Sequence, residues 1–164
     1  PRTVKVETAG GSITATSEDD GTTSRVEVSS AAGTTTMESD GDRATIRGPQ
    51  GTTTIDTTLG LDALGVPVPP GARRKKTANS SGIAEIVTPQ GKQITAALEM
   101  DADTDPKSVV AFYEERYTLN MQVVTGDAAM ISAQLEDGAT LTVSLGKPKK
   151  GVRDCVVMVM RPAK

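Results

Sequence analysis

The sequence predicts a mainly β, α+β fold, in which an N-terminal antiparallel β-meander precedes a C-terminal ββαββββ domain with one amphipathic helix on an antiparallel sheet. Residues 1–58 are rich in Thr, Ser, Gly and Asp, and their few apolar residues alternate with polar ones, as in half-buried strands. All three aromatic residues of the chain lie within residues 109–117, at helical spacing. The chain is therefore predicted to divide into a Thr/Gly-rich meander of 1–58, a Pro-rich linker of 59–72 and an α+β domain of 73–164.

Turn signals that contain glycine separate the short strands of the first part. Gly10 and Gly11 offer the positive φ of a tight reversal, and glycines recur about every 8–12 residues, the spacing of consecutive hairpins. The sequence therefore predicts six strands in a meander. They cover residues 3–8, 12–16, 24–28, 34–38, 44–47 and 52–56.

One face of this meander is predicted to carry its larger apolar side chains. These are Val4, Val6, Ile13, Ala15, Val26, Val28, Met37, Ile46 and Ile55. Burial of a large aliphatic side chain contributes about 1.5–3 kcal/mol, whereas ordering costs about 1–2 kcal/mol for each backbone residue. So few side chains do not offset that cost, and the sheet needs a surface to pack on. The candidates are the C-terminal domain, a second copy of the chain, or another protein.

Residues 59–72 are predicted to form an extended linker. Pro67, Pro69 and Pro70 lack the N–H group that sheet pairing needs. The leucines of this segment remain able to dock on a core.

The C-terminal domain is predicted to hold the main core. Strands at 82–87 and 94–100 come first, and apolar residues alternate along the second. Asp105 suits an N-cap, and Pro106 suits the first helical position. From Val109 onward the apolar spacing predicts an amphipathic helix whose three aromatic rings lie on the core-facing stripe. Four strands follow, at residues 121–125, 128–135, 139–145 and 154–160.

The absence of histidine excludes several catalytic chemistries, because Ser-His and Cys-His nucleophiles and imidazole-bound zinc all need that side chain. The single Cys155 excludes an internal disulfide, and its apolar neighbours predict a buried thiol. The Asp-x-Asp-x-Asp run at 101–105 has the spacing that begins a calcium loop, but Pro106 replaces the required glycine, so a strand end and an N-cap are predicted instead. We expect no enzyme activity, no cofactor and no metal site.

The densest basic run of the chain comprises Arg73, Arg74, Lys75 and Lys76. Such a run attracts anionic lipid headgroups, at about 1 kcal/mol per charge, or an acidic partner. The other interpretation is a solvated strand edge whose charges discourage edge pairing. The run is therefore a candidate site for an anionic ligand or a partner.

Two motifs flank the first strand pair of the C-terminal domain. Residues 66–72 read V-P-V-P-P-G-A, and residues 105–113 read D-P-K-S-V-V-A-F-Y. With these motifs, the chain from about Leu61 onward resembles an uncharacterised bacterial extracytoplasmic, lipoprotein-like domain. In that group a P-V-x-P-G-A opening precedes the sheet, a V-V-A-F-Y helix covers it, and a Gly/Thr-rich strand ladder often comes first. The resemblance implies a location in the cell envelope and a non-enzymatic role.

These features predict a non-catalytic structural or protein-interaction module, an extrinsic accessory subunit of a membrane-associated assembly. The alternative is a module that binds an anionic ligand or membrane surface through its basic run. A net charge of −3 and the scarcity of aromatic rings argue against nucleic-acid binding, so other protein subunits are the expected partners. Thr/Ser-rich strands with few lysines favour the periplasm or cell surface, with peripheral membrane association, and a cytoplasmic location stays open.

Overall fold

The computed structural model describes residues 1–75 and 82–164, which form one antiparallel sheet of 13 strands with one α-helix, α1 (Pro106–Glu114), and one 3-10 helix, η1 (Leu61–Leu64). The mainly β, α+β class is confirmed. The strands are β1 (Arg2–Thr8), β2 (Gly11–Ser17), β3 (Thr23–Ser30), β4 (Gly33–Asp40), β5 (Arg43–Gly48), β6 (Gly51–Asp56), β7 (Arg73–Arg74), β8 (Ile83–Thr88), β9 (Gly91–Asp101), β10 (Leu119–Val124), β11 (Ala129–Gln134), β12 (Thr140–Leu145) and β13 (Val152–Pro162).

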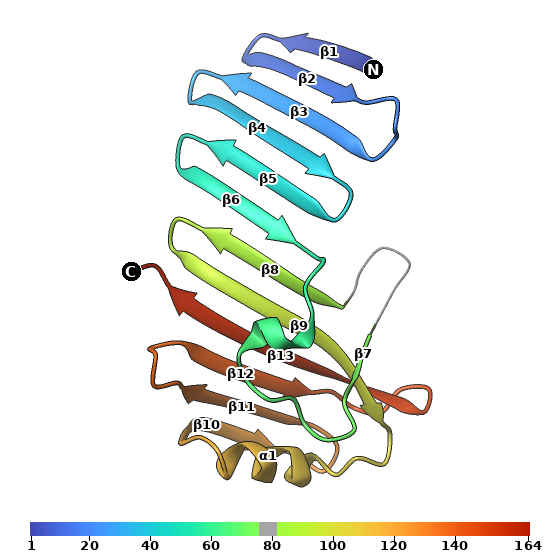
Figure 1. Cartoon of the computed structure of the whole chain (residues 1–164), viewed down its shortest axis with the longest axis vertical. Helices are drawn as coiled ribbons and strands as arrows, with labels where there is room; N and C mark the ends of the chain where they lie inside the picture. Colours follow the sequence, from blue (N-terminus) through green and yellow to red (C-terminus); the bar gives the residue numbers. More distant parts are fainter. Residues whose placement is uncertain (76–81) are drawn as a thin grey trace.

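The first six strands, β1 to β6, form a meander in which each strand pairs with the next, and we call them the ladder (Figure 1). All six strands predicted for residues 1–58 are present. Glycine allows the tight spacing at the turns. Gly11 has a φ of 155°, and a Cβ at this position would lie 1.9 Å from the carbonyl oxygen of Ser29 on β3.

The ladder joins the C-terminal strands edge to edge. β6 pairs with β8 over three residue pairs: Thr54 with Val87, Ile55 with Ile86, and Asp56 with Glu85. Figure 1 shows the ladder extending away from α1, which lies at the opposite end of the sheet. The C-terminal part therefore lengthens the sheet of the ladder and covers neither of its faces.

One face of the C-terminal strands holds the core. The chain leaves β9, passes through α1 to β10 at the far edge, and returns through β11 and β12 to β13, which pairs with β9 over 11 residues. Alternate residues of β9 are buried, from Ile94 to Met100, and so are those of β12, from Leu141 to Leu145. This alternation matches the period of two that the sequence shows there.

Helix α1 covers this core face. The carboxylate of Asp105 accepts a hydrogen bond from the backbone N–H of Lys107 at 3.0 Å, which confirms the predicted N-cap. Tyr113 is fully buried, and Phe112 and Tyr117 are half-buried against the core. The prediction that the rings belong to the core is thus confirmed, although Tyr117 lies beyond the last residue of the helix.

The segment 59–72, predicted to be an extended linker, also packs on the core face. It contains η1, and both Leu64 and Pro69 are fully buried. The hydroxyl of Tyr113 on α1 donates a hydrogen bond to the carbonyl oxygen of Pro67 at 3.0 Å. This segment is therefore part of the layer over the sheet, while the three-part division of the chain stays a prediction.

Candidate functional site

The register of the ladder places its larger apolar residues on one face, as the sequence predicts. In β2 to β6 and β8, all of which are described, the positions on this face that lack a large apolar residue hold Gly, Ala, Ser or Thr, and none is charged. We call it the uncharged face. Two rows of register partners cross it: Val6, Ile13 and Val28, and then Val4, Ala15, Val26, Met37 and Ile46.

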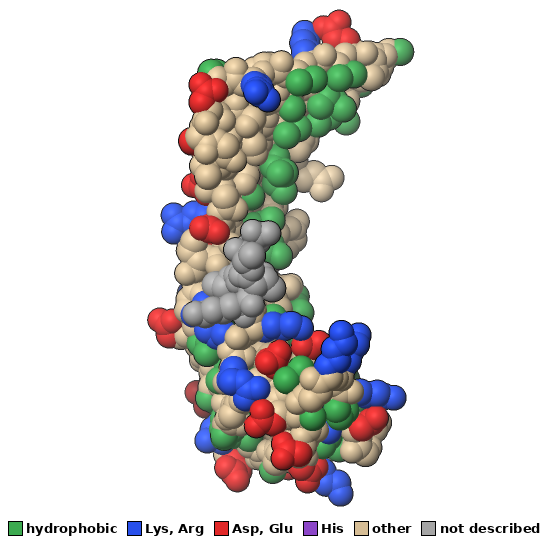
Figure 2. Space-filling view, turned by 90° about the vertical axis from the view of Figure 1, so that its right-hand side faces the viewer, with side chains coloured by type: hydrophobic (Ala, Val, Ile, Leu, Met, Phe, Trp, Pro, Cys, Tyr) green, Lys and Arg blue, Asp and Glu red, His purple; other side chains and the backbone are tan. Residues whose placement is uncertain are grey.

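Several side chains on the uncharged face are open to solvent. Val4 is 63% exposed, Val6 is 50% exposed, and Ile13, Val28 and Met37 are between 41% and 43% exposed. Figure 2 shows apolar side chains gathered in a strip along one side of the upper part of the molecule, where the ladder lies. Contiguous exposed apolar surface in a soluble domain typically marks an interaction site.

The opposite face of the ladder carries the charged side chains of β2 to β6, and we call it the charged face. In β1, Lys5 and Glu7 also lie on the charged face, whereas Arg2, the register partner of Ser17, lies at the edge of the uncharged face. Glu38 lies between two arginines, 3.2 Å from Arg25 and 2.8 Å from Arg47. Arg43 contacts Asp56 at 3.1 Å. Exposed pairs of this kind contribute about 0–1 kcal/mol each. They favour contact of this face with water and do little to hold the ladder together.

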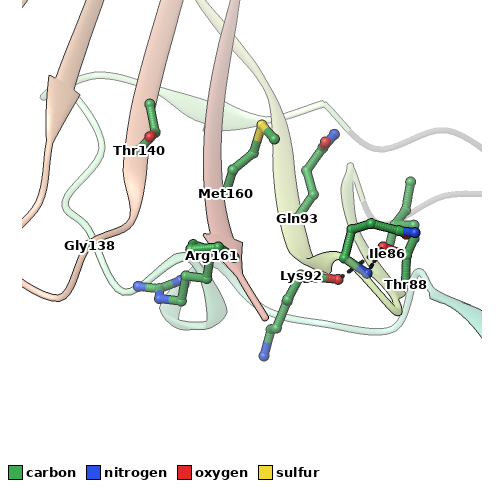
Figure 3. Close-up of a pocket in the computed structure, with 11 residues that line it drawn as sticks. Ile86, Thr88, Lys92, Gln93, Gly138, Thr140, Met160 and Arg161 are labelled. Carbon is green, nitrogen blue, oxygen red and sulfur yellow. Dashed lines mark hydrogen bonds between the residues drawn. The ribbon is translucent and has the colours of Figure 1, made fainter. Parts of the chain in front are cut away.

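The uncharged face continues onto the C-terminal strands, where it contains an open cavity of about 360 Å³. Ile86, Gln93, Met160 and Thr140 follow one another in register across β8, β9, β13 and β12, and they line the cavity (Figure 3). The cavity is therefore an apolar depression beside the ladder, on the same side of the sheet. Further exposed apolar side chains on this side are Met121, Val123 and Met130.

The predicted basic run lies beside acidic side chains. Arg73 contacts Asp101 at 3.0 Å, and Lys75 contacts Asp154 at 2.7 Å. A hydrogen bond from Lys75 to the Asp154 carboxylate raises the pKa of Lys75, and the Coulomb attraction adds to this effect. These carboxylates offset the positive charge that the run would present to an anion.

Of the other two residues in the basic run, the structure describes only Arg74. Arg74 donates a hydrogen bond to the carbonyl oxygen of Leu59 at 3.1 Å, and Lys76 lies outside the described residues. Glu99 and Asp154 are register partners on the same side of the sheet as the uncharged face. The acidic and basic side chains here therefore form a charged border at one end of that face.

The most perturbed ionisable groups lie in the core. Cys155 and Tyr113 are fully buried, and burial raises the pKa of the Cys155 thiol to about 11 and that of the Tyr113 phenol further above its usual value. Neither group faces solvent, where a substrate would approach. Within residues 1–75 and 82–164, no group of three His, Cys, Asp or Glu side chains is placed to hold a metal ion. Nor is any helix in that range long and apolar enough to cross a membrane.

The separation of charge between the two faces is a feature that the apolar pattern alone did not reveal. Arg25, Glu27 and Glu38 occupy strand positions of the opposite parity to Val26 and Met37. If the charged residues of each predicted strand are sorted into odd and even positions, the sequence alone reveals this separation. No sequence pattern predicts the cavity, because its lining combines residues of β9 and β13, which lie far apart in the chain.

Comparisons with known proteins add no relative. The chain matches no protein-family model, no curated protein and no solved structure.

Proposed function

We propose that this chain is a non-catalytic structural and protein-interaction module that docks a partner protein on its uncharged face. One observation carries the proposal: two rows of apolar side chains, five of them 41–63% exposed, lie on a face that has no charge in β2 to β6 and only Arg2 at the edge in β1. We further propose that the module is an extrinsic accessory subunit of a membrane-associated assembly outside the cytoplasm. The composition of the strands and the resemblance of the C-terminal sequence support this location.

The energetics of the ladder favour a partner. A stable β-domain normally buries its sheet against a second layer, and the ladder has no second layer among the described residues. Each Å² of apolar surface removed from water contributes about 25 cal/mol. A partner on the uncharged face would supply the missing layer without burying the ion pairs of Arg25 and Arg47 on the charged face.

The chemistry of the face favours a protein over a lipid surface. Elements that lie on membranes combine apolar residues with Lys, Arg and interfacial aromatic rings. The ladder has no aromatic residue, and of its four arginines only Arg2, at the start of β1, lies on the uncharged face. A neutral, aliphatic strip matches the centre of a protein interface, where charged residues are depleted.

Site-specific photo-crosslinking in the native cells tests the docking. A photoreactive residue at Val28 lies on the uncharged face, and the same residue at the neighbouring Glu27 lies on the charged face. We expect a protein adduct of one defined mass from Val28 and little from Glu27, with the crosslinked peptide identified by mass spectrometry. Equal adducts from both positions, or none from Val28 in folded protein, would refute the docking.

A further inference from the structure

Resting on the proposed docking function, we infer that the partner on the uncharged face is a second copy of this chain. In this arrangement the ladders of two copies stack face to face about a two-fold axis and form a two-layer β-sandwich. The axis passes near the middle of the ladder, between β3 and β4. Each ladder then provides the layer that the other lacks.

The area of the ladder is sufficient for a stable dimer. Six strands at about 4.8 Å spacing span about 29 Å, and seven residues at about 3.3 Å span about 23 Å. Each copy would therefore contribute about 650 Å², and the pair about 1,300 Å². Specific, stable interfaces begin at about 1,200 Å² in total.

The distribution of charge favours a like partner. At a two-fold contact a charge close to the axis meets its own copy, so the surface near the axis must be free of charge or must carry charges that pair across it. The uncharged face of β3 and β4 meets this requirement, and Arg2 lies away from the axis at the outer edge, on β1. The net charge of −3 makes this requirement stronger, because two copies repel each other elsewhere. In the proposed sandwich both uncharged faces point inward, and the ion pairs of Arg25 and Arg43 remain outside in water.

The ladder needs such a layer more than the rest of the sheet does. Behind the uncharged side of β9 and β12, the other face of the sheet packs against α1 and the segment 59–72. Behind the uncharged face of β1 to β4 there are only exposed and half-buried polar side chains. Burial of apolar surface against a second copy therefore stabilises the ladder more than it stabilises the rest of the sheet. For this reason we place the contact at the ladder.

The first test measures the association of the full chain by sedimentation velocity between about 1 µM and 1 mM. We expect a dimer for the wild type. Ile13→Asp places a carboxylate on the uncharged face, and its neighbour Thr14→Asp places the same charge on the charged face. We expect Ile13→Asp to raise the dissociation constant by at least about 100-fold, because symmetry buries the new charge twice, and Thr14→Asp to leave it within about threefold.

The second test locates the contact. Met37 lies next to the proposed axis and is 41% exposed, whereas Thr36 precedes it on the charged face. With a bismaleimide of about 10 Å reach, the spacing of packed sheets, we expect covalent dimers from Met37→Cys and not from Thr36→Cys. The native Cys155 is fully buried and does not compete for the reagent.

The outcomes separate this inference from the docking function. A wild type that stays monomeric, a dimer that Ile13→Asp does not weaken, or crosslinking from Thr36→Cys alone would overturn the inference. A photo-adduct at Val28 with a different protein would overturn it as well, yet would leave the docking function intact. Should Ile13→Asp lose its circular-dichroism signal, Val4→Asp repeats the test at a side chain that is 63% exposed.

Discussion

The hydroxyl of Tyr113 donates a hydrogen bond to the carbonyl oxygen of Pro67, 3.0 Å away, and thereby ties α1 to the segment that shares its side of the sheet. Tyr113→Phe removes only this contact. We expect the free energy of unfolding to fall by about 1 kcal/mol in urea titrations. Tyr117→Phe, at a half-buried ring, serves as the control and should change it by less than about 0.5 kcal/mol. Equal losses in the two variants would show that the contact contributes nothing particular.

Arg153 is a buried cation that holds three backbone carbonyls. It donates hydrogen bonds to the carbonyl oxygens of Ala102, Asp127 and Gly146. Arg153→Met keeps much of the aliphatic bulk but leaves these acceptors unsatisfied, so we expect a loss of about 3 kcal/mol in chemical unfolding. Arg25→Met removes an exposed arginine on the ladder and should cost less than about 1 kcal/mol. A cost for Arg153→Met as small as that for Arg25→Met would contradict this structural role.

Cys155 makes stability depend on alkaline pH. Burial raises the pKa of its thiol from 9.0 to about 11. Between these values the unfolded thiol ionises while the folded thiol stays protonated, so the free energy of unfolding falls as pH rises, by about 2–3 kcal/mol in full.

The control for this pH dependence is Cys155→Val, which removes the titrating group and keeps the site apolar. We expect the difference in unfolding free energy between the two proteins to change between pH 9 and about 11 and to be constant below that range. A difference that stays constant over the whole range would refute the assignment.

The close packing of β3 against Gly11 predicts a strong effect of a single methyl group. Gly11→Ala would bring its Cβ within 1.9 Å of the Ser29 carbonyl oxygen, so the turn must open. We expect faster hydrogen exchange of the β1 and β2 amides, by at least about tenfold, with β9 unchanged. Gly10→Ala is the matched control, because nothing lies within 4 Å of the added carbon. Similar exchange in the two variants would contradict the geometry.

The pairing of the basic run predicts weak binding to anionic membranes. Combined Arg73→Gln and Lys75→Gln changes remove cations that Asp101 and Asp154 already offset. We expect co-sedimentation with phosphatidylserine vesicles to change by less than about twofold. Lys149→Gln combined with Lys150→Gln gives a control of equal charge. A loss specific to the first pair would support the anionic-surface alternative.

The ladder was predictable because its pairing is local. Each strand pairs with its neighbour in the chain, so alternation and turn glycines determine both the strands and the face on which Val26 and Met37 lie. The N-cap at Asp105 was also predictable, because it depends on a hydrogen bond between residues that are two positions apart in the chain. The uncharged face, which is the candidate site, thus follows in large part from the sequence.

What was not predictable depends on contacts between distant segments. The prolines of 59–72 correctly exclude a long strand, but the burial of Leu64 depends on packing against the distant strand β9. The basic run appeared free in the sequence because its partners, Asp101 and Asp154, lie far along the chain. The cavity at Met160 requires β13 to lie beside β9, which no local pattern indicates.

The three residue pairs between β6 and β8 have a mechanical consequence. Adjacent strands within the ladder share at least four pairs, and β9 and β13 share 11, so the junction at Ile55 and Ile86 is the shortest connection between the two parts of the sheet. This pairing joins the two parts of the sheet with fewer paired residues than any pairing inside the ladder. A partner bound at the far end of the ladder therefore acts on the C-terminal strands through the short pairing of β6 with β8.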